Sequence, residues 1–277
     1  MKKISVLLIF LFYGLSVFAR IGEFRSLGDA DICVVYKRTM VLDTINPDNR
    51  FKIDNLTLMA GKEGSAFYSE EKKMDLAMSD NPEYFQQKYS DQTLFTKIAN
   101  FEKETIFRDY KKNICIDHQR YDLTNWELTE EIEKPEWIVG DSVINILGYD
   151  CIMATSTFRG RTWIAFFCPE IPISEGPWKL CGLPGLILRA FDDRQEYCYD
   201  AITINTKDLG IVEFYNYDDR LKIKNRQEGL RHRRKSMFEN VNSKINALTG
   251  GALTIPSKVK SSQIKRYDFE ETDYPHN

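Results

Sequence analysis

Residues Cys151–Cys168 read CIMATSTFRGRTWIAFFC, two runs of β-branched and aromatic residues on either side of Arg159 and Gly160. Such runs favour strands, and a glycine between them marks a tight turn. A hairpin centred between these two residues pairs Phe158 with Arg161 and continues outward to the cysteines at its ends. The stretch therefore predicts an antiparallel hairpin and, with similar runs elsewhere, a sheet built from successive hairpins.

The register of this hairpin places Cys151 opposite Cys168. The two would form a non-hydrogen-bonded pair, in which the Cα atoms lie about 4.5 Å apart, at the short end of disulfide geometry. The register therefore predicts a Cys151–Cys168 disulfide, and two buried free thiols are the alternative if a bulge breaks the register. Spacing does not settle the pairing of the other four cysteines, which are Cys33, Cys115, Cys181 and Cys198.

The hairpin tip carries two arginines, Arg159 and Arg161. A guanidinium group forms paired hydrogen bonds with a carboxylate or a phosphate, so the two arginines are candidate residues of an anion-binding site. The alternative is that they are exposed and solvated, as is common for arginines at a tip. Glu170, which follows the second strand, is a third candidate ligand-binding residue, and its alternative is a surface charge on an irregular loop.

The stretch Cys181–Phe191, CGLPGLILRAF, follows a crossing that prolines interrupt. In the four residues 183–186, Pro184 stands at the second position and Gly185 at the third, which favours a type II turn. The aliphatic residues that follow predict a strand buried on both faces. The run lacks the glycine spacing and the Gly-Lys-Ser/Thr ending of a phosphate loop. We therefore interpret it as a structural motif, made of Gly182, Leu183, Pro184, Gly185, Leu186 and Ile187.

The chain as a whole predicts an α+β fold that is mainly an antiparallel β-sheet. Strand signals follow one another from about residue 30 to 210. From 219 to 248, apolar residues recur at helical spacing, which predicts an amphipathic C-terminal helix packed on the sheet. Its basic opposite face is either solvated or binds an anionic surface. A strongly curved or half-barrel sheet is one version of this fold, and we expect residues 256–277 to form a loose tail.

The first residues have the three parts of a secretory signal peptide: Lys2 and Lys3, an apolar run from Ile4 to Phe18, and then Ala19. The run is shorter than the roughly 20 residues of a membrane-spanning helix, so we expect cleavage after residue 19 and no transmembrane span in the mature chain. The protein would then be exported through the inner membrane and be periplasmic, outer-membrane-associated or secreted. A net charge of −3 argues against nucleic acid as a partner.

The segment GYDCIMATSTFRGRTWIAFFCPEIPISEGPWKLCGLPGLIL, at 148–188, combines Gly-Tyr-x-Cys, Phe-Arg-Gly-Arg, Glu-Ile-Pro and Gly-Leu-Pro-Gly-Leu-Ile. These motifs resemble the core pattern of the GLPGLI family of exported Bacteroidetes proteins, also called the Porphyromonas gingivalis family. The likeness covers roughly Ile32 to Ile204, and Cys168 and Cys181 depart from it. It implies a single GLPGLI-type domain over residues 20–277 with no assigned biochemical function, and it supplies no catalytic residue.

These observations favour a non-catalytic binding or interaction module in the cell envelope over an enzyme. Its ligand would be apolar or peptidic, or its partner an outer-membrane or other envelope protein. The alternative is an extracytoplasmic hydrolase with a non-standard site, which requires Glu170, Arg159, Arg161 and His118 to meet in one cleft. Because the chain contains no Gly-x-Ser-x-Gly, His-Glu-x-x-His or Cys-x-x-Cys motif, we predict no catalytic residue, no metal site and no cofactor.

Overall fold

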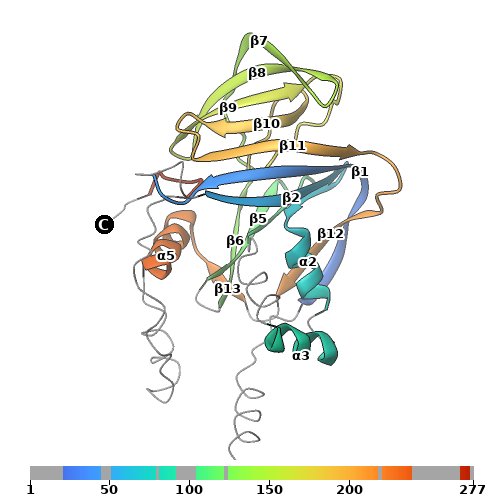
Figure 1. Cartoon of the computed structure of the whole chain (residues 1–277), viewed down its shortest axis with the longest axis vertical. Coiled ribbons are helices and arrows are strands. Elements are labelled where there is room, and N and C mark those ends of the chain that lie inside the picture. The colour runs from blue at the N-terminus through green and yellow to red at the C-terminus, as the bar shows by residue number, and fades with distance from the viewer. Residues whose placement is uncertain are drawn as a thin grey trace, which may run out of the picture.

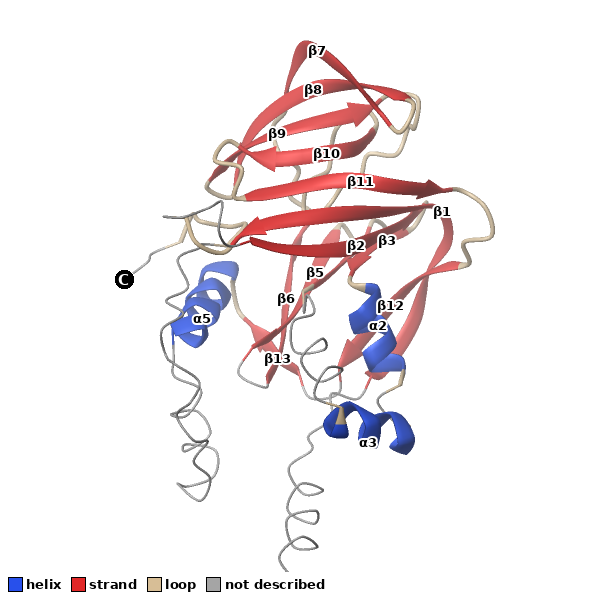
Figure 2. Cartoon of the chain, viewed as in Figure 1, coloured by secondary structure: helices blue, strands red, loops and turns tan. Residues whose placement is uncertain are grey.

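The computed structural model describes residues 21–44, 51–78, 81–91, 104–121, 124–217, 220–238 and 269–274. The expected signal peptide at 1–19 and most of the expected tail lie outside these ranges. The described chain is mostly β-strand and has three helices (Figure 2). Within these ranges, no helix is both long enough and apolar enough to span a bilayer.

The described strands form one large sheet (Figure 1). In chain order they are β1 (Ile21–Val41), β2 (Phe51–Gly61), β3 (Gly64–Tyr68), β4 (Thr105–Asp109), β5 (Ile114–Tyr121), β6 (Thr124–Glu131), β7 (Ile138–Ile146), β8 (Tyr149–Phe158), β9 (Arg161–Cys168), β10 (Leu186–Asp192), β11 (Tyr197–Asn205), β12 (Ile211–Tyr217) and β13 (Arg220–Ile223). The helices are α2 (Glu70–Ala77), α3 (Pro82–Ser90) and α5 (Arg226–Phe238).

Strand β1 is the central strand of the sheet. The strand order is β13-β6-β5-β4-β3-β2-β1-β11-β10-β9-β8-β7, and β12 pairs with the first part of β1. Strands β2–β6 and β7–β11 are thus two successive antiparallel meanders, and β1 joins them by pairing with both β2 and β11. The antiparallel prediction is confirmed for these strands, but β13 pairs with β6 in parallel, so the sheet is mixed. Its two ends, β7 and β13, are not joined, so the sheet is open.

The β8–β9 hairpin has the predicted register. Phe158 pairs with Arg161, and the pairing continues to Ile152 and Phe167. The tip is a two-residue turn with positive φ at Arg159 (53°) and Gly160 (83°), the combination typical of a type I′ turn.

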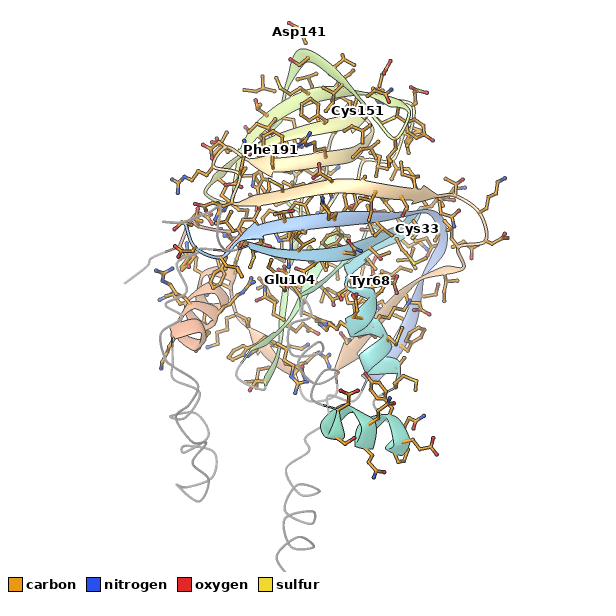
Figure 3. All side chains as sticks on the ribbon, viewed as in Figure 1. Cys33, Tyr68, Glu104, Asp141, Cys151 and Phe191 are labelled. Carbon is orange, nitrogen blue, oxygen red and sulfur yellow. The ribbon has the colours of Figure 1, made fainter. Side chains whose placement is uncertain are left out.

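The expected Cys151–Cys168 disulfide is absent from the structure, in which both residues are free thiols buried in the main hydrophobic core. The Cys151 thiol lies 3.6 Å from the carbonyl oxygen of Tyr149, to which it donates a weak hydrogen bond. The cysteines Cys33, Cys115, Cys181 and Cys198, whose pairing the sequence left open, are free as well. Figure 3 shows Cys33 on β1 and Cys151 on β8, in different parts of the sheet.

The Gly-Leu-Pro-Gly-Leu-Ile motif leads into β10, as predicted, but not through a type II turn. The φ of Gly185 is 158°, whereas the third residue of such a turn has φ near 80°. Glycine is needed there for space, because a Cβ atom would lie 2.2 Å from the carbonyl oxygen of Cys168. Leu186 and Ile187 are fully buried, and the Tyr36 hydroxyl of β1 donates a 2.7 Å hydrogen bond to the Ile187 carbonyl.

The C-terminal region differs from the sequence-based expectation in two ways. Residues 220–223, expected to be helical, form strand β13, and helix α5 follows it. Residues 269–274, expected in a loose tail, are packed on the body: Phe269 and Tyr274 form a small apolar cluster with Leu230 of α5. The apolar positions of the expected helix beyond residue 238 lie outside the described residues.

Strand β7 lies at one edge of the sheet, at the top of Figure 1, and most of its residues are exposed. Its apolar residues Ile138, Val139 and Val143 are solvent-exposed. Asp141 points away from the body (Figure 3), and the pairing with β8 is irregular between Val139 and Val143. A charge and a bulge are common devices that keep an edge from pairing with another sheet.

We predict that Gly185→Ala lowers the free energy of unfolding by about 3 kcal/mol or more, because the added Cβ overlaps the backbone of β9. Urea denaturation measures the effect. Gly210→Ala is the matched control: Gly210 has φ 75° but no atom within 4 Å of its Cβ position, so only the backbone cost of about 1 kcal/mol is expected. Equal losses in the two variants would contradict the role given to Gly185.

Candidate functional site

The main polar site of the described chain surrounds residues 269–274, which we call the C-terminal segment. Its sequence, FEETDY, contains three carboxylates and two aromatic rings. In Figure 1 it is the short red stretch near the ends of β1 and β11, beside α5. Basic side chains from the sheet, the proline-interrupted crossing and α5 contact it, and we call them the basic cluster: Arg38, Arg159, Arg161, Lys179, Arg226, Arg233 and Arg234.

Glu271 lies at the centre of the basic cluster. Its carboxylate accepts hydrogen bonds from the Lys179 ammonium (2.6 Å) and from the guanidinium groups of Arg159 (3.1 Å) and Arg226 (2.8 Å). Glu271 and Lys179 are each less than a tenth exposed. Charge-assisted hydrogen bonds of this kind are stronger than neutral ones, so this carboxylate is the best-held group of the segment.

Glu270 occupies a second position on the other side of the segment. Its carboxylate accepts hydrogen bonds from Arg38 of β1 (3.2 Å) and from the hydroxyl of Tyr199 of β11 (3.3 Å). Both of these bonds are longer than the three bonds to the Glu271 carboxylate. The two consecutive carboxylates therefore bind at separate, unequal positions.

The backbone of the segment also binds to the hairpin tip. The guanidinium of Arg161 donates two hydrogen bonds, of 2.9 and 2.7 Å, to the Phe269 carbonyl. The Thr272 amide donates to the Arg159 carbonyl (2.9 Å), and the Thr272 hydroxyl donates to the Gly160 carbonyl (2.9 Å). These contacts fix the path of the segment without depending on most of its side chains.

Gly160 allows this close approach. A Cβ atom at this position would lie 2.4 Å from the Thr272 hydroxyl oxygen and 2.6 Å from the Asp273 amide nitrogen. The glycine that the type I′ turn requires is therefore also the surface on which the segment lies.

Helix α5 contacts the segment from another side. Arg226 pairs with the carboxylate of Asp273 through both terminal nitrogens. The guanidinium carbon of Arg233 lies 4.2 Å from the ring centroid of Phe269, within the range of a cation–π contact. Arg234 donates a hydrogen bond to the Tyr274 hydroxyl.

Four cations of the basic cluster also pair with carboxylates of the protein body. These carboxylates lie on β2, β5, β6 and β10 rather than in the segment. The pairs are Arg38–Asp54, Arg159–Glu130 (3.0 Å), Arg161–Asp192 (2.8 Å) and Lys179–Asp117 (2.8 Å). The body itself thus holds these cations in position, and the segment binds to groups that are already oriented.

The electrostatics agree with this arrangement. Burial alone would raise the pKa of Glu271, but Lys179, Arg159 and Arg226 outweigh it and lower that pKa to about 2. Burial likewise disfavours the charged form of Lys179, yet the carboxylates of Asp117, Glu271 and Glu130 hold its pKa well above the ordinary value. Both groups are therefore charged at neutral pH.

The structure brings two of the three predicted ligand-binding residues together. Arg159 and Arg161 are both in the basic cluster, and both are buried, so the alternative of exposed, solvated tip arginines is wrong. Glu170 is exposed and follows the opposite end of β9; at about 3.4 Å per residue, this eight-residue strand separates it from the tip by more than about 20 Å. His118 is buried beside Glu127, in contact with the ring of Phe107.

The cleft required by the hydrolase alternative is therefore not formed, because Glu170 is remote from the tip. The sequence did not predict that the other five cations of the basic cluster, or Glu270 and Glu271 of the segment, join the two tip arginines. These five cations are Arg38, Lys179, Arg226, Arg233 and Arg234. The acidic and aromatic FEETDY was the one available signal, but nothing local links it to residues far back in the chain. Among the described residues, no group of three or more His, Cys, Asp or Glu side chains is placed to hold a metal ion.

We predict that Gly160→Ala releases the C-terminal segment, because the added Cβ overlaps Thr272 and Asp273. The measurement is the rate at which a carboxypeptidase removes Tyr274, followed by mass spectrometry, and we expect an increase of at least about tenfold. Gly148→Ala is the control, since Gly148 has a similar φ (90°) in the β7–β8 turn with no atom within 4 Å of its Cβ position. An unchanged rate in Gly160→Ala would show that the segment does not lie on the tip.

A second prediction concerns pH. Because the pKa of Glu271 is lowered from 4.5 to about 2, its charge stabilises docking above pH 4.5, and this contribution is lost as the pH falls toward 2. The difference corresponds to about 3 kcal/mol at full protonation. The amide NMR shift of Thr272, followed against pH, reports docking, and Glu271→Gln should remove this pH-dependent step. An identical titration in that variant would assign the step to another group.

Comparison with known proteins gives limited matches. Two solved structures of PNGF-II, in the P21 and C2 space groups, share 12% and 13% identity with the chain at TM-scores of 0.45 and 0.44. They cover 69% and 64% of this chain, which spans less than a third of theirs (31% and 27%). No curated protein matches the chain. A family model described as "Protein of unknown function (Porph_ging)", a Porphyromonas gingivalis-associated family, matches residues 158–189, from the end of β8 through the proline-interrupted crossing into β10.

Proposed function

We propose that this protein is a non-catalytic binding module whose basic cluster holds an extended segment of polypeptide. The observation that supports the proposal most directly is the C-terminal segment itself, which lies in the cluster as a peptide ligand would. Its backbone binds to Arg159 and Arg161, and its carboxylates bind to the surrounding cations. Main-chain hydrogen bonds combined with side-chain positions are the usual means by which proteins recognise extended peptides.

The pairing within the body supports a binding site over a purely structural contact. Each of Arg38, Arg159, Arg161 and Lys179 keeps a carboxylate partner of its own when the segment leaves. Leaving a buried charge unpaired would cost several kcal/mol, and these partners avoid that cost. The cluster can therefore stay formed without the segment and accept another peptide in its place.

The setting of this function is also a proposal. The signal peptide expected at residues 1–19 and the resemblance to the GLPGLI family support an exported protein of the cell envelope, with an envelope or outer-membrane protein as the source of the peptide. The hydrolase alternative gains no support, because Glu170 and His118 do not join the two arginines.

The proposal is tested with a full-length Glu271→Lys variant and a labelled peptide of residues 267–276, YDFEETDYPH. A lysine among Lys179, Arg159 and Arg226 opposes docking of the variant's own segment, so the cluster is free to take the peptide. Wild type should bind the peptide at least about tenfold more weakly, because its tethered segment competes at an effective concentration on the order of millimolar. Fluorescence anisotropy measures both affinities.

A scrambled peptide and the circular dichroism spectrum of the variant are the controls. A folded variant that binds neither the native nor the scrambled peptide would overturn the proposal. Should Glu271→Lys fail to fold, Glu271→Gln serves as the receptor, since it weakens the same contact without adding a charge.

A further inference from the structure

We propose that the ligand class of the basic cluster is an acidic peptide of another polypeptide, in which an aromatic residue precedes two glutamates and the second glutamate determines specificity. This inference rests on the proposed binding function and names its ligand. The C-terminal segment carries the same pattern and competes with that peptide for the basic cluster.

Backbone contacts to the segment do not select a sequence. The bonds from Arg161 to the Phe269 carbonyl and from the Thr272 amide to the Arg159 carbonyl use groups that nearly every residue has. The sequence preference of the site must therefore come from the side chains of the bound segment. The positions that these side chains occupy differ in the number of charges of the body that face them.

The position of Glu271 is the most selective. Three cations converge on its carboxylate, one on Oε1 (Lys179, 2.6 Å) and two on Oε2 (Arg159, 3.1 Å, and Arg226, 2.8 Å). A glutamine in place of the carboxylate would turn an NH₂ group toward at least one of these cations and lose the charge. An aspartate is one methylene shorter, so it could not keep all three bonds at these lengths.

The position of Glu270 is less selective. The bond from Arg38 to Glu270 is 3.2 Å long, which is longer than each of the three bonds to Glu271. The hydroxyl of Tyr199 binds a glutamine oxygen as readily as a carboxylate oxygen. We therefore expect a glutamine here to be tolerated far better than one at position 271.

The aromatic position is occupied by Phe269, which is buried and lies under the guanidinium of Arg233 and against Leu230. Tyr274 stacks on the same ring, with centroids 6.2 Å apart. An aromatic ring can form a cation–π contact with Arg233 and also pack against Leu230. An alanine at this position would lose both.

A small hollow with room for about one water molecule lies beside Glu271. It is lined by Asp117, Lys179, Arg226, Leu230 and Glu271. One carboxylate oxygen of buried Asp117 has no hydrogen-bond partner among the described residues.

The test measures the affinity of the full-length Glu271→Lys variant for a set of YDFEETDYPH peptides, each with one replacement. We expect at least about tenfold weaker binding for Glu271→Gln, Glu271→Asp and Phe269→Ala peptides, and less than about threefold for the Glu270→Gln peptide. Equal binding of the native peptide and the Glu271→Gln peptide would overturn this inference but leave the binding function intact. Binding of no peptide by the folded variant would overturn both.

A receptor-side variant gives an independent result. In the Glu271→Lys background, Arg226→Gln on α5 removes one of the cations that face Glu271 of the peptide. The preference of the receptor for glutamate over glutamine at this peptide position should then shrink by at least about threefold. Arg189→Gln, which removes an exposed arginine of β10 that pairs with Asp200, is the matched control and should leave the preference unchanged. A preference that Arg226→Gln does not alter would contradict the assignment of this position.

Discussion

The buried ammonium group of Lys179 is the constraint on which the site depends. A buried cation is tolerated only when it is paired, and Lys179 has partners on two sides: Asp117 on β5 at 2.8 Å and Glu271 of the C-terminal segment at 2.6 Å. Asp117 belongs to the β2–β6 meander, whereas Lys179 belongs to the crossing between β9 and β10. Their ion pair therefore connects the two halves of the sheet at the point where the segment binds.

The fold and the site share several elements. The match to the family model begins at the last residue of β8 and includes the tip of the β8–β9 hairpin, which supplies Arg159, Gly160 and Arg161. The crossing that leads to the Gly-Leu-Pro-Gly-Leu-Ile motif supplies Lys179. The backbone of this motif is fixed by the close approach of Gly185 to Cys168. The motif begins three residues after Lys179 in the chain and leads from this residue of the site into strand β10.

Local features of the sequence were predictable, and long-range ones were not. The hairpin register and the burial of β10 follow from alternation, turn residues and aliphatic runs within one segment. The basic cluster could not be predicted, because Lys179 and Glu271 are 92 positions apart and Arg159 and Glu271 are 112 apart. For the same reason, the sequence left open whether the tip arginines are solvated: the acidic partners that bury them come from β6, β10 and the C-terminal segment. Strand β13 was missed because its parallel partner, β6, lies far back in the chain.

Hydrogen–deuterium exchange of the full-length protein tests the central claim most directly. If the C-terminal segment is a ligand held by a body that is already organised, its amides in 269–274 are protected in wild type. They then lose protection in Glu271→Lys, while the β8–β9 hairpin exchanges as slowly as before. Loss of protection throughout the hairpin and β5 in that variant would show that the segment is part of the core. An unprotected segment in wild type would show that it does not bind the basic cluster.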